Sequence, residues 1–354
     1  MSRQSKKILV GMSGGVDSSV AAVLLAKQGF EVAGVSLNLL SCDRQIERSC
    51  CAPEDRMDAR EVCAQMGLGH SVVDCRLLFR EAVIDPFVSE YLRGRTPSPC
   101  IICNERVKFQ ALLKEADRQG ARYIATGHYA RIAGGESFRL LCAEAREKDQ
   151  SYFLFRMNQE ELARTIFPLG AMTKGEVRKT ASEFGLATRD KPESQEVCFV
   201  PDGDCAAFLE AREGSSIKGP GNFIDARGRV LGRHRGIHAY TIGQRRGLGF
   251  GIGRRQYVVR IDPEKNEIVL GSDKELLCSE MTVRDVSWVA GKPGVLTEAT
   301  VRIRSTHAGE KAELSADEDG CIRVRFERPV RAIAPGQAAV FYREDEVMGG
   351  GWIE

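Results

Sequence analysis

The first half of the chain alternates short apolar runs with longer segments in which apolar residues recur at helical spacing. Strands separated by helix-length segments form βαβ units, so this alternation predicts an α/β, doubly wound parallel sheet with helices on both faces. Such sheets bind ligands at the carboxyl ends of their strands. The predicted strands are 7–10, 31–40, 70–75 and 121–126, and the predicted helices are 20–28, 54–66, 77–92 (interrupted near Pro86) and 103–119.

The second half follows a different pattern. Thr173 and Glu176 form a capping-box pattern, which opens a further helix. Beyond Ser279, apolar and polar side chains alternate with the period of half-buried strands, as at 299–304 and 321–326. Short strands separated by Gly, Asp and Pro turns predict a small β-barrel, a fold often used to bind RNA.

Composition narrows the class of protein. The 354 residues, 43% of them hydrophobic, suffice for two or three domains and exclude wholesale disorder. The longest uncharged apolar run, 20–26, is far shorter than a membrane span, and no signal-peptide run follows Met1. We therefore expect a cytoplasmic protein without a membrane partner, whose twelve cysteines are reduced thiols available for sulfur or metal chemistry.

A turn rich in Gly and Ser follows the first predicted strand. Its glycines let backbone N–H groups converge, and the next helix adds its positive N-terminal dipole, so the turn predicts a phosphate cradle. It lacks the lysine of a Walker motif and the spacing of a dinucleotide fingerprint. The turn reads Gly11-Met12-Ser13-Gly14-Gly15-Val16-Asp17-Ser18. It resembles the motif of the PP-loop ATP pyrophosphatases, which implies cleavage of ATP between the α- and β-phosphates, with Asp17 helping to hold Mg²⁺.

Two cysteines and a histidine are candidates for chemistry. Cys100 and Cys103 stand at C-x-x-C spacing where a helix is expected to begin, and a thiol at a helix N-terminus has a lowered pKa. The alternatives are half of a structural zinc site or two ordinary thiols, and Cys198 is the natural third member of a reactive set. Gly127 and His128 follow the fourth strand, where Gly127 would let the backbone approach a nucleotide and His128 would contact phosphate or substrate, or serve structure alone.

The segment 226–260 is strongly basic. It has nine arginines, eight glycines and no Asp or Glu. Arginine forks match phosphate oxygens, so the segment predicts a nucleic-acid partner, with Tyr240, Phe250 and Tyr257 available for base stacking. The alternative is a solvated basic face without a partner.

A series of short motifs runs along the chain, at 11–18, 95–99, 103–104, 125–129, 148–153, 198–199, 241–249 and 334–342. In this order, the motifs are similar to those of the tRNA-specific 2-thiouridylases. The resemblance implies ATP-dependent replacement of O2 of the wobble uridine of tRNA by sulfur, with a sulfur donor protein as a second partner. It also implies a PP-loop catalytic domain (1–205), a central tRNA-binding domain (206–278) and a C-terminal β-barrel (279–354).

The resemblance also implies residue roles. ATP is bound by the turn 11–18, the backbone near Leu37, and Gly127. Cys103 is the nucleophile, and Cys198 carries a persulfide. The expected tRNA contacts are Ser98, Pro99 and Cys100 at the target base, His128 beside it, and Lys148, Asp149, Gln150, Arg304, Ser305 and Gln337 elsewhere.

Two departures from the family pattern affect these expectations. Many members have Asn-Pro-Asp where this chain has Ser98-Pro99-Cys100, so a third thiol replaces a carboxylate. Cys100, Cys103 and Cys198 resemble the three-cysteine set of the iron–sulfur tRNA thiolases, which makes a 4Fe–4S cluster an alternative to the persulfide. Arg304-Ser305 stands where Arg-Tyr is usual, so a stacking contact on tRNA is in doubt.

The sequence supports a tRNA sulfurtransferase against two rivals. A PP-loop synthetase acting on a small metabolite would explain the turn but leaves the thiols and the arginines unexplained. A non-catalytic RNA- or metal-binding protein would explain the thiols and the arginines but not the turn of an ATP-cleaving enzyme. In the favoured interpretation, ATP adenylates O2 of a flipped wobble uridine, and thiol-borne sulfur then attacks C2.

Overall fold

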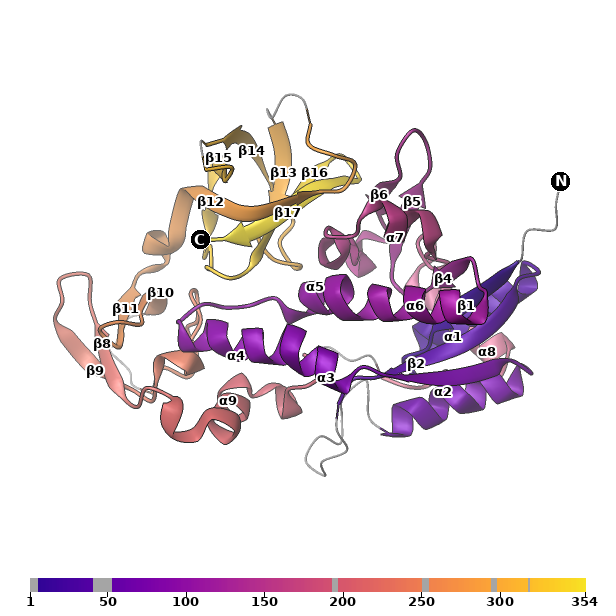
Figure 1. Cartoon of the computed structure of the whole chain (residues 1–354). Coiled ribbons are helices and arrows are strands. Elements are labelled where there is room, and N and C mark those ends of the chain that lie inside the picture. Colours follow the sequence, from indigo (N-terminus) through magenta and orange to yellow (C-terminus); the bar gives the residue numbers. More distant parts are fainter. Residues whose placement is uncertain (1–5, 41–52, 193–196, 250–254, 294–297, 318) are drawn as a thin grey trace.

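The structure is a computed structural model that describes residues 6–40, 53–192, 197–249, 255–293, 298–317 and 319–354. In chain order, its strands form a parallel sheet, a small mixed sheet and a barrel (Figure 1). Phe250 lies outside the described residues. Within them, no helix is both long and apolar enough to cross a membrane.

The N-terminal sheet is parallel, as the alternation predicts. Its strand order is β3-β2-β1-β4-β7. Ile8 and Val10 of β1 pack in the cluster formed with α1, α2 and α8, whereas Leu9 packs in the cluster formed with α6. Because both faces of the sheet are covered, the doubly wound prediction is confirmed. The strands are β1 (Lys7–Gly11), β2 (Glu31–Asn38), β3 (Gly69–Asp74), β4 (Tyr123–Ala125) and β7 (Thr165–Ile166).

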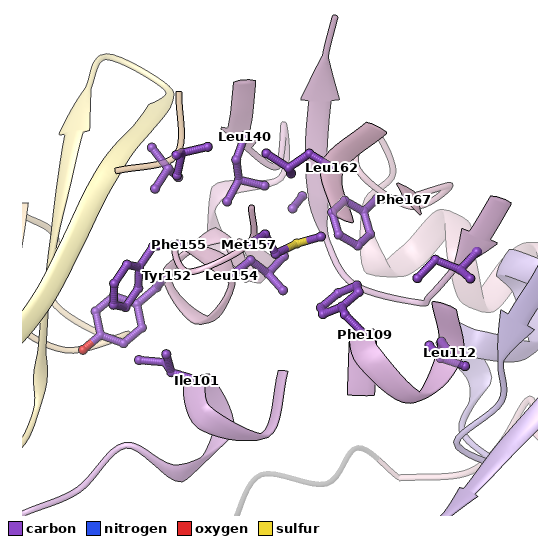
Figure 2. Close-up of a cluster of buried hydrophobic side chains, with 14 of the residues drawn as sticks. Ile101, Phe109, Leu112, Leu140, Tyr152, Leu154, Phe155, Met157, Leu162 and Phe167 are labelled. Carbon is purple, nitrogen blue, oxygen red and sulfur yellow. The ribbon is translucent and has the colours of Figure 1, made fainter. Parts of the chain in front are cut away.

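The helices pack apolar side chains against the sheet. Figure 2 shows the cluster on the α6 side of the sheet, where Phe109 and Leu112 meet Leu154, Met157 and Phe167. The capping box predicted before α8 is present, with Thr173 and Glu176 each bonded to the other's backbone N–H. The helices are α1 (Val16–Lys27), α2 (Pro53–Gln65), α3 (Arg76–Phe79), α4 (Asp85–Leu92), α5 (Pro99–Cys103), α6 (Phe109–Gln119), α7 (Gln159–Arg164), α8 (Lys174–Glu183) and α9 (Cys205–Glu213).

Two predicted helices contain a wider π-turn. One turn, Arg80–Ile84, ends just before Pro86, whose missing N–H cannot continue the ordinary helical ladder. The other, Asn104–Lys108, joins α5 to α6. The helix predicted from Cys103 therefore begins earlier, at Pro99, and Cys103 lies beyond its first turn. The helix N-terminus consequently acts on Cys100 rather than on Cys103, which corrects the expectation for that thiol.

The central region is a small mixed sheet in the order β10-β11-β8-β9. Its core buries Phe223, Ile268 and Tyr240, the last only 6% exposed with its ring against His234. The expectation that Tyr240 stacks on a base is therefore wrong, because its ring fills this core. The strands are β8 (Gly221–Ile224), β9 (Val230–His234), β10 (Tyr257–Asp262) and β11 (Glu267–Gly271).

The C-terminal strands close into the predicted barrel, in the order β12-β15-β14-β13-β16-β17 with β17 paired back to β12. A hairpin of the first domain, β5 (Ala130–Ala133) and β6 (Arg139–Cys142), continues this sheet through β17. The alternation did not predict that hairpin. The barrel strands are β12 (Leu277–Trp288), β13 (Glu298–Arg302), β14 (Glu310–Ala316), β15 (Ile322–Arg331), β16 (Ala338–Arg343) and β17 (Glu346–Ile353).

Candidate active site

A cavity lies at the carboxyl ends of β1, β2 and β4, where the fold predicts a ligand. Most of the residues expected to hold ATP line it together. Gly14, Gly15 and Val16 belong to the same turn but do not form its wall. The predicted residues in the wall are Gly11, Met12, Ser13, Asp17, Ser18, Leu37 and Gly127, joined by His128 and Gln150.

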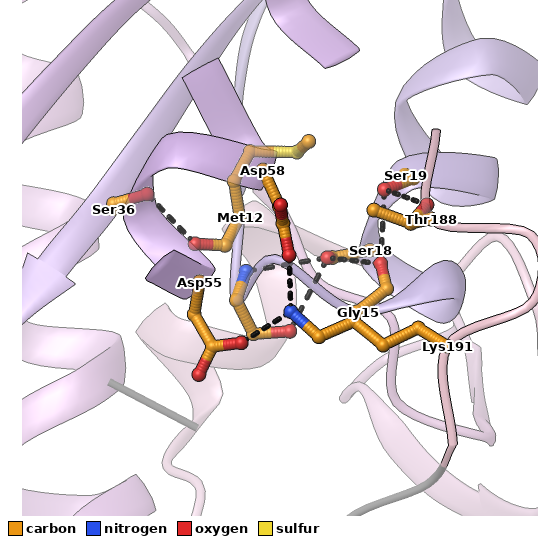
Figure 3. A network of polar contacts seen from close by, with 10 residues as sticks. Met12, Gly15, Ser18, Ser19, Ser36, Asp55, Asp58, Thr188 and Lys191 are labelled. Atoms are coloured by element: carbon orange, nitrogen blue, oxygen red, sulfur yellow. Dashed lines mark hydrogen bonds and ion pairs between the residues drawn. The ribbon is translucent and has the colours of Figure 1, made fainter. Parts of the chain in front are cut away.

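The turn after β1 is held in shape by its own hydroxyl groups (Figure 3). Ser18 Oγ accepts a bond from the Ser13 backbone N–H (3.2 Å) and donates to the Gly15 carbonyl (3.1 Å). Ser19 Oγ also donates to the Gly15 carbonyl, at 2.9 Å. Ser36 of β2 donates to the Met12 carbonyl at 2.9 Å, which ties the turn to the neighbouring strand. The cradle is therefore built before any ligand binds.

Two glycines permit contacts that a side chain would block. Gly14 has φ +73°, and a Cβ there would lie 2.1 Å from the backbone oxygen of Asp55. A Cβ on Gly127 would lie 2.7 Å from the backbone N of Ser18. The start of α2 and the turn after β4 therefore pack directly on the phosphate turn.

Asp17 already has two partners. Lys174 Nζ lies 2.7 and 2.9 Å from its two carboxylate oxygens, and Tyr129 Oη donates to one of them at 2.8 Å. The carboxylate faces the cavity and is of the type that binds Mg²⁺, so it fits the expected role. Lys174, which the motif analysis did not select, is the cation that now neutralises it.

His128 is neutral at physiological pH. The pKa of its imidazole is lowered from 6.5 to about 3, first by burial and then by the positive charge of Lys108. Its Nδ1 shares a hydrogen bond of 2.7 Å with Thr126 Oγ1, and its ring stacks on Phe109. His128 therefore offers the cavity a hydrogen-bonding group without a charge.

The lowered pKa of His128 predicts a pH effect on stability. Between pH 6.5 and about 3 the unfolded chain binds a proton at this imidazole that the folded chain does not, so stability falls as the pH drops through that window. His128→Gln should reduce the slope of unfolding free energy against pH by up to about 1.4 kcal/mol per unit. Urea unfolding of both proteins at several pH values between about 4 and 7 measures this slope. An unchanged slope would contradict the assigned pKa.

The cavity also contains charged residues that the sequence analysis missed. Asp55 and Arg56 come from the start of α2, and Lys108 comes from the π-turn after α5. Arg56 Nη1 donates to Asn38 Oδ1 at 2.8 Å at the end of β2. The sequence could have indicated Asp55 and Arg56 only through their position. A helix that follows β2 begins at the edge of the sheet where the phosphate turn lies.

The structure brings two of the three candidate thiols into one hydrophobic cluster. Cys103 is 5% exposed there, and Cys198 packs against the same cluster beside Phe199. Cys100 is exposed on the first turn of α5. This common packing supports the pairing of Cys103 with Cys198.

No set of three Cys, His, Asp or Glu side chains within the described ranges is grouped so that it could hold a metal ion. Cys100, Cys103 and Cys198 thus do not form a site for a single metal ion, and we derive no step through a cluster. Three other cysteines, Cys63, Cys75 and Cys142, are buried, and burial raises the pKa of each thiol, to about 11 for Cys63. These three are structural.

The segment expected at the target base lies elsewhere. Ser98 and Pro99 line a second cavity, between the first domain and the barrel, together with Arg95, Arg106, Arg284, Phe87 and Trp352. Thr96 bonds to the barrel through Pro335 O (2.8 Å) and to the central region through Thr241 Oγ1 (3.3 Å). Gln337 Nε2 donates to the Thr96 and Pro97 carbonyls at 3.0 and 3.2 Å. Gln337 therefore holds this segment in place, and its tRNA contact stays a prediction.

Two segments expected to contact tRNA, 148–150 and 304–305, are joined inside the protein through Arg302. The Asp149 side chain is 1% exposed and pairs with Arg302 at 2.7 Å. Arg302 also donates to the Ser305 carbonyl at 2.7 Å, and Arg304 donates to the Arg331 carbonyl at 3.4 Å. This ion pair fixes the segment of Lys148 and Gln150 against the barrel. In the basic segment, Arg245 and Arg246 are exposed.

Comparisons with known proteins cover nearly the whole chain. Three family models match it, described as tRNA methyl transferase HUP domain (6–202), tRNA methyl transferase PRC-barrel domain (206–272) and aminomethyltransferase beta-barrel domain (278–353). A tRNA-specific 2-thiouridylase MnmA of Geobacter metallireducens is 47% identical over 99% of this chain and 97% of its own. The protein of the same name from Carboxydothermus hydrogenoformans is 47% identical over 99% of this chain and 98% of its own.

A solved structure is a more distant match. It is the U34-tRNA thiolase NcsA from Methanococcus maripaludis with its [4Fe-4S] cluster, 19% identical over 53% of this chain and 59% of that chain, with a TM-score of 0.35. A likeness at this level says nothing about the chemistry of the present site.

Proposed function

Because this chain belongs to the tRNA-specific 2-thiouridylases, we propose that it converts the wobble uridine of tRNA to 2-thiouridine, using ATP and thiol-borne sulfur. The observation that carries the proposal is the cavity in which the phosphate turn, Gly127, His128 and Lys108 meet at one edge of the sheet. A tRNA sulfurtransferase needs such a site to turn a carbonyl oxygen into a leaving group.

In the first step, uridine O2 attacks the α-phosphorus of ATP, and the bond to the β-phosphate breaks. The turn 11–18 and the N-terminus of α1 would hold the departing pyrophosphate. Lys108 and Arg56 supply positive charge in the same cavity, where negative charge grows during the attack. Asp17 would hold Mg²⁺, which neutralises phosphate charge when bound.

In the second step, a persulfide on Cys198 attacks C2, and AMP leaves with the former O2. The Cys103 thiolate then attacks Cys198 Sγ, which breaks the sulfur–sulfur bond and leaves sulfur on the base. A disulfide between Cys103 and Cys198 results, and an external thiol must reduce it. The packing of both residues in one cluster supports this pair. A sulfur donor protein would load Cys198.

The decisive measurement is nucleotide release that depends on tRNA. We expect AMP and pyrophosphate in equal amounts when the protein receives ATP and a tRNA transcript with a wobble uridine, and 2-thiouridine by mass spectrometry when a persulfide donor is added. The matched control is the same transcript with cytidine at that position. A metabolite synthetase would ignore the difference between the transcripts, and a binding protein would release no AMP with either.

A further inference from the structure

A chain of hydrogen bonds connects the carboxylate of Asp17 to the C-terminal barrel. It begins at Tyr129, which is buried and whose hydroxyl donates to Asp17 Oδ1 at 2.8 Å. The backbone N–H of Tyr129 donates to Gln150 Oε1 at 3.0 Å, and its carbonyl accepts a bond from the Gln150 N–H at 2.9 Å. These two bonds hold the backbone of Tyr129 at both of its polar groups. The position of the phenol therefore depends on the position of Gln150.

Gln150 lies in a turn that the barrel holds in place. The neighbouring Asp149 carboxylate accepts bonds from the backbone N–H groups of Ala143 (3.0 Å) and Ser151 (3.2 Å), which shape the turn around it. Arg302 of β13 binds the other carboxylate oxygen at 2.7 Å. Because the Asp149 side chain is 1% exposed, water is not available as a substitute partner for its charge. The ion pair with the barrel therefore stabilises the turn that carries Gln150.

The contacts at Asp17 suit a carboxylate that is to hold Mg²⁺. Lys174 Nζ lies within hydrogen-bond distance of both carboxylate oxygens, so this cation and Mg²⁺ compete for the same group. Tyr129 brings no charge, and its bond to Oδ1 does not occupy Oδ2. Hydrogen-bond donors behind a metal-binding side chain fix its orientation, and their removal weakens metal binding. The Tyr129 hydroxyl is such a donor.

We propose that Tyr129 is a positioning residue that holds Asp17 in the orientation required for Mg²⁺, and that the Asp149–Arg302 ion pair makes the barrel part of this support. The inference rests on the proposed function, in which Asp17 holds Mg²⁺, and adds the barrel to the nucleotide site. Without the ion pair, the turn at Gln150 loosens and the Tyr129 hydroxyl no longer fixes Asp17. The first domain then binds nucleotide with Mg²⁺ at full strength only while the barrel is docked on it.

The test is the affinity of the full-length protein for α,β-methylene ATP, measured by calorimetry with Mg²⁺ and with EDTA in its place. The ratio of the two affinities gives the contribution of the metal. Tyr129→Phe should lower this ratio about tenfold and leave the affinity in EDTA unchanged, because the ring still fills its place. Tyr152→Phe is the matched control, since it removes a buried hydroxyl whose partner is the Ala338 carbonyl. We expect it to keep the ratio of the natural protein.

A second substitution tests the support from the barrel. Asp149→Asn keeps the size of the side chain and removes the charge that pairs with Arg302, so it should lower the ratio about threefold. In the Tyr129→Phe protein the same substitution should have no further effect, because the hydroxyl through which it acts is gone. A full further loss in the double variant would show that the barrel does not act through Tyr129, and that part of the inference would be wrong.

The outcomes separate this inference from the proposed function. If the natural protein binds no analogue under either condition, the proposed function fails. If it binds the analogue and Tyr129→Phe keeps the full ratio, or Tyr152→Phe loses as much, the positioning role is wrong while the proposed function stands. If Mg²⁺ does not strengthen binding to the natural protein, Asp17 does not hold the metal and the inference is wrong, although nucleotide binding remains.

Discussion

Cys103→Ser and Cys198→Ser are each expected to lower 2-thiouridine formation by about 10³-fold or more while tRNA-dependent pyrophosphate release continues. Adenylation uses the cavity at the ends of β1, β2 and β4, and neither thiol lines that cavity. Sulfur transfer needs both thiols, because one carries the sulfur and the other releases it. A serine hydroxyl replaces the thiol with little change in volume but cannot form the persulfide or the disulfide.

Cys278 and Cys100 supply matched controls for these variants. Cys278 is exposed on β12, outside the Cys103 cluster, so Cys278→Ser should retain activity. Cys100→Ser separates the two sulfur carriers. If the sulfur is carried as a persulfide, Cys100→Ser should retain most of the thiolation activity. If a cluster on the three cysteines carries the sulfur, Cys100→Ser should lose as much activity as Cys103→Ser. Loss of pyrophosphate release in the Cys103 and Cys198 variants would contradict the separation of the two steps.

The cavity could be predicted from the sequence because it depends on local patterns. The glycine-rich turn and Gly127 each follow a strand, and parallel strands end at one edge of a sheet, so Ser13 and Gly127 had to come together once the alternation was recognised. Leu37 was expected there from the family resemblance alone. The barrel was predictable for a similar reason. Strands β13, β14 and β15 alternate more buried and more exposed residues over most of their length, and this period does not depend on distant partners.

The roles of individual polar side chains were less predictable, because distant residues decide them. Asp149 lies in a polar triplet that looks exposed, but Arg302, far along the chain on the barrel, buries it in an ion pair. Gln337 was expected to contact tRNA, and its side chain donates hydrogen bonds to the carbonyls of Thr96 and Pro97. Both contacts cross between domains, and no local pattern in either segment indicates them.

Gly14→Ala is expected to destroy the nucleotide site, while Gly15→Ala, one residue away, leaves it nearly intact. Gly14 has φ +73°, where residues with a side chain are strained, and its Cβ would lie 2.1 Å from Asp55 O. Gly15 has φ −96° and ψ 166°, an ordinary extended conformation, and a Cβ there meets nothing closer than Ser13 Oγ at 3.5 Å.

The expected cost of Gly14→Ala combines backbone strain and displacement of α2, together about 2–4 kcal/mol. Because 1.4 kcal/mol corresponds to a factor of ten, ATP affinity should fall by roughly 30-fold or more if the cost appears on binding. If the substitution destabilises the folded protein even without ATP, the unfolding free energy of the first domain falls instead. Calorimetric titration of both variants with ATP measures the loss of affinity, and their thermal unfolding measures the loss of stability. Equal behaviour of the two alanine variants would show that α2 does not press on the turn.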